Sequence, residues 1–117
     1  MESLIFTDEQ KDLKLYYNDA VADATFTITE KNTSNPYDFT GFTDVNFRIY
    51  KNQGDRTVLA ALVNSTNLTI PTPTNGKILL NYQYSEIDLT PSVYWYDLKV
   101  TLSGKERVVS YGLLSIV

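Results

Sequence analysis

Hydrophobic and polar positions alternate over several short stretches of the chain, and the longest stretch runs from Tyr94 to Ser103. One of its faces is apolar and the other is mostly polar, with Tyr94, Tyr96, Leu98, Val100 and Leu102 on the first and Trp95, Asp97, Lys99, Thr101 and Ser103 on the second. A period of two predicts a long, half-buried β-strand. Residues 88–91, which end at Pro91, predict the turn before it.

The same alternation, bounded by turn residues, predicts further strands over residues 13–17, 24–30, 44–51, 57–63, 67–71, 77–82 and 106–117. Residues 57–63 are apolar nearly throughout, so their short length and the flanking Val58 and Val63 favour a strand over a short helix. Residues 83–89 are expected to cross between sheets as a turn or a single helical turn.

The last predicted strand, 106–117, is apolar on both faces. Val108, Leu114 and Ile116 fall on one face, while Val109, Tyr111, Leu113 and Val117 fall on the other. Gly112 is the expected position of a bulge or register shift. Such a strand needs cover on both sides, from its own core or from another subunit.

The pattern contains about eight short strands, with turn signals every 8–12 residues or so, and no convincing helix of about 10 residues or more. It predicts an all-β fold, an antiparallel β-sandwich. We expect one domain over residues 13–117, preceded by an N-terminal arm over residues 1–12. The arm is either frayed, as chain ends often are, or it docks Leu4, Ile5 and Phe6 onto a neighbouring subunit as an added strand or plug.

The predicted loop over residues 31–43 carries three aromatic side chains, Tyr37, Phe39 and Phe42. These rings either cover the core or form an exposed contact surface, because contiguous exposed apolar area usually marks an interface. The sequence leaves both alternatives open.

Composition limits the function. The 117 residues suit one domain, and 43% hydrophobic residues with nine Tyr are enough for a core. The absence of Cys and His removes the usual nucleophile, general base and transition-metal ligands. A net charge of −4 opposes binding to nucleic acid or to an anionic membrane. The N-terminus lacks the pattern of a secretory signal, so synthesis in a cytosol is expected.

No group of residues predicts catalysis, a metal site or a cofactor. The carboxylates Asp8, Glu9 and Asp12, and the pair Asp19 and Asp23, do not match the ligand spacing of a calcium loop. No neighbouring residue pattern separates the pKa values of a carboxylate pair as acid–base catalysis requires. A non-enzymatic protein is therefore expected.

Outward-facing aromatic residues are the remaining candidates for function: Trp95, and also Tyr17, Tyr50 and Tyr82. They suit either a platform for sugar rings or a surface covered by loops or a partner, since Trp and Tyr are enriched at interfaces. The second interpretation is favoured.

The segment Leu89-Thr-Pro-Ser-Val-Tyr94 is similar to the tyrosine corner of immunoglobulin-like and fibronectin-like domains, in which the tyrosine hydroxyl bonds back to the turn backbone. Four segments in order also resemble a domain of tailed-phage virion proteins, notably the N-terminal domain of baseplate upper proteins. These segments are residues 45–51 (VNFRIYK), 76–78 (GKI), 89–98 (LTPSVYWYDL) and 112–116 (GLLSI). Ser92 departs from the glycine usual in that pattern, and a baseplate protein would continue beyond Val117.

The resemblance implies an immunoglobulin-like sandwich that serves as a structural component of a phage particle, in the baseplate or tail, the neck, or as a capsid accessory. It would be made in the host cytoplasm and held in the virion by contacts with other virion proteins and with its own copies. The alternative is a carbohydrate-binding or adhesin module that uses exposed aromatic rings. The candidate contact residues are Leu4, Ile5, Phe6, Tyr37, Phe39, Phe42, Trp95, Tyr111 and Leu113.

Overall fold

The computed structural model describes residues 6–7, 9–10, 12–15, 22–30, 33–82 and 87–117. These residues form short strands and one 3₁₀ turn. The elements are β1 (Phe6–Thr7), β2 (Glu9–Gln10), β3 (Leu13–Leu15), β4 (Ala22–Thr27), β5 (Thr29–Glu30), β6 (Asp44–Tyr50), β7 (Ala60–Val63), β8 (Leu68–Thr69), η1 (Pro73–Asn75), β9 (Lys77–Tyr82), β10 (Ser92–Leu102) and β11 (Lys105–Ile116).

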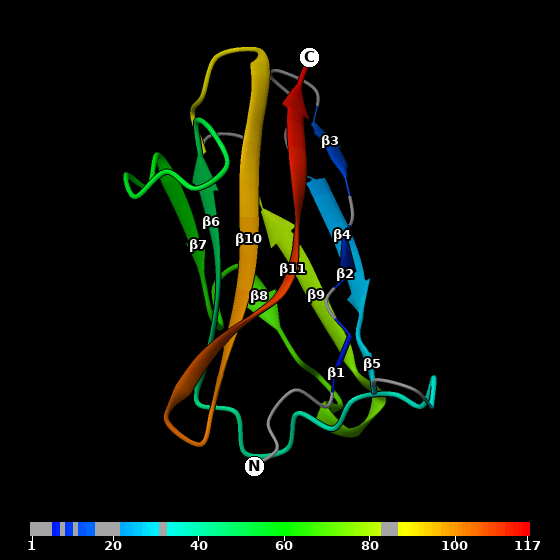
Figure 1. Ribbon diagram of the computed structural model, residues 1–117. Helices are drawn as coiled ribbons and strands as arrows, with labels where there is room; N and C mark the ends of the chain where they lie inside the picture. The colour runs from blue at the N-terminus through cyan, green and yellow to red at the C-terminus, as the bar shows by residue number, and fades with distance from the viewer. Residues whose placement is uncertain (1–5, 8, 11, 16–21, 31–32, 83–86) are drawn as a thin grey trace.

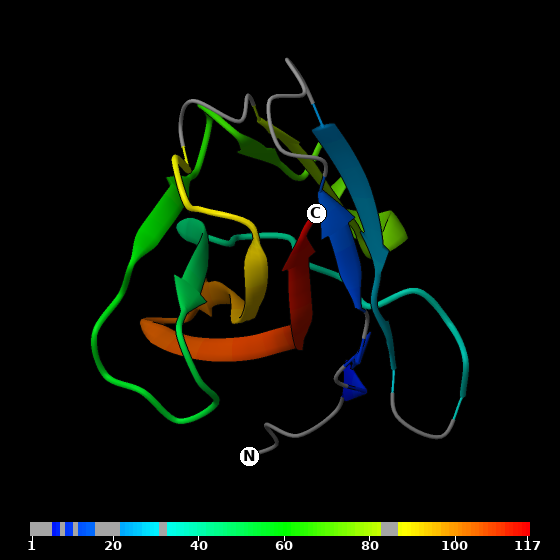
Figure 2. The same cartoon turned by 90° about the horizontal axis from the view of Figure 1, so that it is seen from above.

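The strands pack as two layers (Figures 1 and 2). The larger sheet has the order β2-β11-β10-β6-β7, with β3 continuing beside β11, and the smaller has the order β4-β9-β8. Strand β5 follows β4 after Ile28 and pairs with β1. All pairings are antiparallel except those of β2 and β3, which run parallel to β11. The chain is all-β, as predicted, and its two packed sheets are consistent with a β-sandwich.

Strand β10 lies between β11 and β6 and follows the predicted alternation along its length. Its inward residues Tyr94, Tyr96, Leu98 and Val100 are buried, while the outward Trp95, Asp97 and Lys99 are half-buried. The alternation predicted for β6 and β4 is confirmed in the same way, because Val45, Phe47, Ile49, Phe26 and Ile28 are all fully enclosed.

Three aromatic rings join the two sheets. Tyr96 of β10 stacks on Phe47 of β6, with ring centroids 4.8 Å apart, and lies 6.1 Å from Phe26 of β4 in the opposite sheet. Aliphatic side chains such as Leu80, Leu98 and Leu114 fill the space around them. Each large apolar side chain buried here contributes about 1.5–3 kcal/mol relative to an exposed one.

The strand predicted over residues 57–63 begins three residues later, at Ala60. Residues 51–59 form an exposed loop in which Val58 and Leu59 are 39% and 41% exposed. The loop is closed locally, since the Asp55 amide donates to the Asn52 carbonyl oxygen and the Asp55 carboxylate accepts from the Asn52 amide. The prediction was wrong because an apolar run without alternation gives no indication of which residues pair with β6.

The bulge in the last strand lies at Val109 and not at Gly112, where it was predicted. Leu98 pairs with Ser110 and Lys99 pairs with Val108, so Val109 is the extra residue, whereas Gly112 pairs regularly with Tyr96. The bulge turns both Val109 and Ser110 into the core and leaves Val108 on the outside. The predicted grouping of Val108 with Leu114 was therefore wrong.

The described part of the N-terminal arm pairs with its own chain. Phe6 and Thr7 pair with β5, and Glu9 and Gln10 pair with β11. The Asp12 carboxylate also accepts a hydrogen bond from the Leu113 amide at 3.1 Å. The added strand that was considered for a neighbouring subunit is thus formed within the chain at Phe6, while Leu4 and Ile5 lie outside the described residues.

The tyrosine-corner hydrogen bond is present, because the Tyr94 hydroxyl donates to the Thr90 carbonyl oxygen at 2.8 Å. We predict that Tyr94→Phe lowers the free energy of unfolding by about 1–3 kcal/mol, since the hydroxyl is buried and its acceptor loses a partner. Urea denaturation measures the change, with Tyr111→Phe on the outer surface as the control. Equal stability of Tyr94→Phe and the parent protein would contradict this role.

Gly76, directly before β9, lies close to the backbone of Ile28 and of Tyr37 in the loop before β6. Its φ is +70°, and its carbonyl oxygen accepts a hydrogen bond from the Ile28 amide. A Cβ atom at this position would lie 2.9 Å from the Tyr37 backbone nitrogen and closer still to the Ile28 carbonyl oxygen.

We predict that Gly76→Ala destabilises the protein more than Gly54→Ala. Gly54 has a φ of +85°, but its Cβ would meet no atom within 4 Å. The control therefore carries only the left-handed backbone cost of about 1–2 kcal/mol, and the backbone clash adds about 1–3 kcal/mol at Gly76. Thermal and urea unfolding of both variants measure the difference, and equal losses would show that the close approach is relieved without cost.

Candidate functional site

The outer face of the larger sheet gathers aromatic and charged side chains from β6, β10 and β11. Strand register places them in rows. Trp95 lies directly between Tyr50 and Leu113, Asp97 lies between Arg48 and Tyr111, and Lys99 lies between Asn46 and Val108. Side chains opposite one another on neighbouring strands are about 4.5–5.5 Å apart at Cβ, so each row is a set of contacts. We call these nine residues, together with Glu106 of β11, which pairs with Arg48 and Lys99, the outer-face cluster.

A cleft of about 320 Å³ opens over this cluster. Its floor and walls come from the three strands, through Trp95, Asp97 and Tyr111 among others, and one side is closed by the loop after β6, through Gln53 and Asp55. Tyr50 and Val108 complete the wall. The cleft therefore combines aromatic surfaces with carboxylate, amide and ammonium groups.

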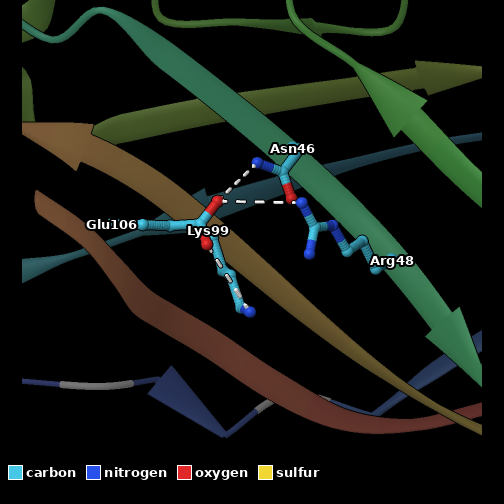
Figure 3. A network of polar contacts seen from close by, with 4 residues as sticks. All are labelled: Asn46, Arg48, Lys99 and Glu106. Atoms are coloured by element: carbon cyan, nitrogen blue, oxygen red, sulfur yellow. Dashed lines mark hydrogen bonds and ion pairs between the residues drawn. The ribbon is translucent and has the colours of Figure 1, made fainter. Parts of the chain in front are cut away.

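Four polar side chains form a network beside the cleft (Figure 3). Glu106 of β11 reaches toward the neighbouring strands, with its carboxylate 3.8 Å from the Arg48 guanidinium and 3.8 Å from the Lys99 ammonium. The Asn46 amide donates to the same carboxylate at 3.2 Å. Both cations are thus paired with one acid, and each exposed pair is worth less than about 1 kcal/mol.

Asp97 lies half-buried at the centre of the cluster. Burial raises the pKa of Asp97 above its ordinary value of 3.8, although the nearby charges of Lys99 and Arg48 and a hydrogen bond from Tyr50 oppose this shift. Burial and the Asp97 charge also raise the pKa of Tyr50. One carboxylate oxygen of Asp97, Oδ1, has no hydrogen-bond partner within the part of the chain that the structure describes.

The predicted contact residues divide into two groups. Trp95, Tyr111 and Leu113 come together on the outer face. The aromatic loop instead covers the core, because Phe39 is 0% exposed and Tyr37 and Phe42 pack against it. Phe39 therefore offers no surface to a partner, and its selection as a contact residue is corrected. Tyr37 and Phe39 pack edge to face with ring centroids 5.0 Å apart.

Sequence reasoning did not select the polar part of the cluster. Arg48, Lys99 and Glu106 were scattered charges in the sequence, and Tyr50 was noted only as an outward aromatic residue. Their convergence depends on which residues face each other across strands, and the bulge at Val109 sets that register. The alternation of β6 and β10 predicted which of their residues face outward, but not which residues of β11 lie beside them. Tyr17, a further candidate, lies outside the described residues.

Within the described ranges there is no group of three or more acidic residues placed to hold a metal ion. The helical content of the same ranges is a single 3₁₀ turn, so they offer no helix with the length and hydropathy to cross a bilayer.

We predict that Asp97→Asn leaves the protein as stable as the parent, or more stable, at pH 7. Burial raises the pKa of Asp97 in the folded state, so ionising this carboxylate costs stability. The loss begins as the pH rises past the unfolded pKa and is complete above the folded pKa. At about pH 2.5 the group is protonated in both states and the advantage of the amide vanishes. Urea unfolding at the two pH values measures this, with Asp44→Asn as an exposed control. A larger benefit of Asp97→Asn at acidic than at neutral pH would be the opposite result.

No model of a known protein family matches the sequence, and no similar sequence was found among curated proteins. What the chain does must therefore be inferred from its outer face and from the segments that carry the phage resemblance.

Proposed function

We propose that this protein is a non-enzymatic, immunoglobulin-like structural component of a tailed-phage particle, which works through protein–protein contacts made by the outer face of its larger sheet. The observation that carries the contact face is the meeting of Trp95, Tyr111 and Leu113, chosen from sequence as contact residues, on two neighbouring strands.

Strand order supports the immunoglobulin-like part of the proposal. In that fold, a hairpin of the last two strands is flanked by an earlier strand in one sheet, and the other sheet pairs the second strand with a later hairpin. Here β10 and β11 form the hairpin, β6 flanks β10, and β4 pairs with β9 and through it with β8. Strand β7 occupies the position of the additional strand of the variable type. The Tyr94 hydroxyl bond to Thr90 adds the expected corner.

The resemblance to baseplate domains supports the location in a phage particle. Three of its four segments correspond to β6, the turn into β10 with most of that strand, and the end of β11, and these strands are neighbours in one sheet. The remaining segment begins at Gly76, whose left-handed backbone conformation favours glycine, and it runs into β9 of the smaller sheet. Most of the resemblance thus falls on the sheet that carries the outer-face cluster.

The apolar part of the outer face suits a protein partner. Val93, 52% exposed, lies two positions before Trp95 on the same face of β10, and Leu113 lies beside Trp95. Aromatic residues at the centre of a polar rim are the usual composition of an energetically important contact. In a symmetric particle many copies repeat one modest contact, so a small surface is sufficient. The partners would be other virion proteins and further copies of this chain.

The test is a mass-spectrometric inventory of purified particles from the phage whose genome encodes the chain, with particles built from tagged variants. We predict that Leu113→Asp reduces incorporation about tenfold or more, because a charge replaces an apolar contact. Leu79→Asp is the matched control, since Leu79 is an exposed leucine of β9 in the other sheet.

Absence of the chain from purified particles would refute the virion assignment. Equal incorporation of Leu113→Asp and Leu79→Asp would instead show that the outer face does not form the contact. Circular dichroism and thermal unfolding of both variants establish that they remain folded.

A further inference from the structure

We propose that the cleft above Trp95 is a binding site for a neutral saccharide of one or two rings. This inference goes beyond the structural role proposed above and does not depend on it. It assigns to the outer-face cluster a small-molecule ligand in addition to a protein contact.

The walls of the cleft match the apolar surfaces of a sugar ring. Trp95, Tyr50 and Tyr111 come from three neighbouring strands, all three are half-buried, and all three line the cleft. A pyranose ring has faces made of C–H groups that pack on aromatic rings, while its hydroxyl groups lie around the edge. Half-buried aromatic side chains supply such packing area at a small cost in conformational entropy.

The polar groups of the cleft match the hydroxyl edge of a sugar. Asp97 and Asp55 provide acceptors, Lys99 provides donors, and Gln53 provides both. Asp97 is half-buried and lines the cleft, so its carboxylate lies beside the space that a sugar hydroxyl would occupy.

The charges in the cleft and beside it favour a neutral ligand. Lys99 in the cleft and Arg48 beside it both lie within ion-pair distance of Glu106. Asp97 and Asp55 add negative charge to the lining. An anionic ligand would have to compete with Glu106 for these cations. A cationic side chain of a partner would approach Asp97 against the fields of Lys99 and Arg48, which already act on it.

The size of the cleft limits the ligand. Its volume of about 320 Å³ lies at the small end of the range of roughly 300–1,000 Å³ that is typical of ligand sites. The loop over residues 51–59 closes only one side, so a monosaccharide or the end of a longer glycan has access. The ligand class that fits is a neutral hexose or N-acetylhexosamine.

The chain has a single tryptophan, and it lies in the cleft, so its fluorescence reports on this site alone. We predict that titration with methyl glycosides of glucose, galactose, rhamnose and N-acetylglucosamine gives a saturable change in Trp95 emission for at least one of them, with a dissociation constant on the order of 1 mM. Glycerol at the same concentrations controls for general polyol effects and should give no saturable change.

Variants are compared by saturation-transfer difference NMR, which does not need the tryptophan. Tyr111→Ala and Asp97→Asn should each weaken binding about tenfold, because one removes an aromatic wall and the other removes a charged acceptor. Leu79→Ala in the other sheet should bind as the parent protein does, and thermal unfolding verifies that all three variants are folded.

The proposal is overturned if none of the glycosides changes Trp95 emission at about 50 mM, or if Tyr111→Ala and Asp97→Asn bind as well as the parent. It is also overturned if N-acetyl-lysine amide or N-acetyl-arginine amide gives a saturable change in Trp95 emission and none of the sugars does. The cleft would then receive a basic side chain of a protein partner. None of these results bears on whether the chain is incorporated into particles.

Discussion

The packing of Tyr96 between the two sheets is the contact on which the rest of this structure depends. Its ring stacks on Phe47 within its own sheet and faces Phe26 of the other, and its hydroxyl lies 3.3 Å from the Ser110 hydroxyl of β11. A buried aromatic side chain of this kind removes roughly 150–250 Å² from water. Because side chains alternate along a strand, an inward Tyr96 requires an outward Trp95 and Asp97. A slip of one residue would bury the charged cluster and expose the core, so the register of the outer face is held from the inside.

The bulge at Val109 also determines which side chains of β11 lie on the outer face. In a regular strand, Val108 and Tyr111 would point to opposite sides, because they are three positions apart. The extra residue restores a common direction, so both side chains line the cleft. It also turns Ser110 inward, where its hydroxyl meets that of Tyr96. Bulges are common beside functional sites because they re-aim side chains in this way.

The sequence was informative where burial is one-sided. The alternation around Phe26, Phe47 and Tyr96 identified their strands and inward faces, since one face of each strand is apolar and the other is mostly polar. It failed at residues 57–59, where Val58 and Leu59 are apolar but exposed, and at Gly112, because glycine marks conformational freedom and not the position of the extra residue. The outer-face cluster was recognised only in part, through Trp95, Tyr111 and Leu113. The pairing of Glu106 with Arg48 joins strands that are distant in the sequence, and only tertiary register brings such charges together.

The chemistry of the outer face favours shape over charge for the binding that we propose. Glu106 occupies both cations of the cluster, and the chain as a whole carries a charge of −4 without a single histidine. A ligand or a partner can therefore contact the aromatic side chains of Trp95, Tyr50 and Tyr111. Hydrogen-bonding groups that are held by their neighbours surround these rings. Such a surface gains affinity by burying rings and gains selectivity from how well the surrounding polar groups are matched, because an unmatched buried polar group costs more than a matched one contributes.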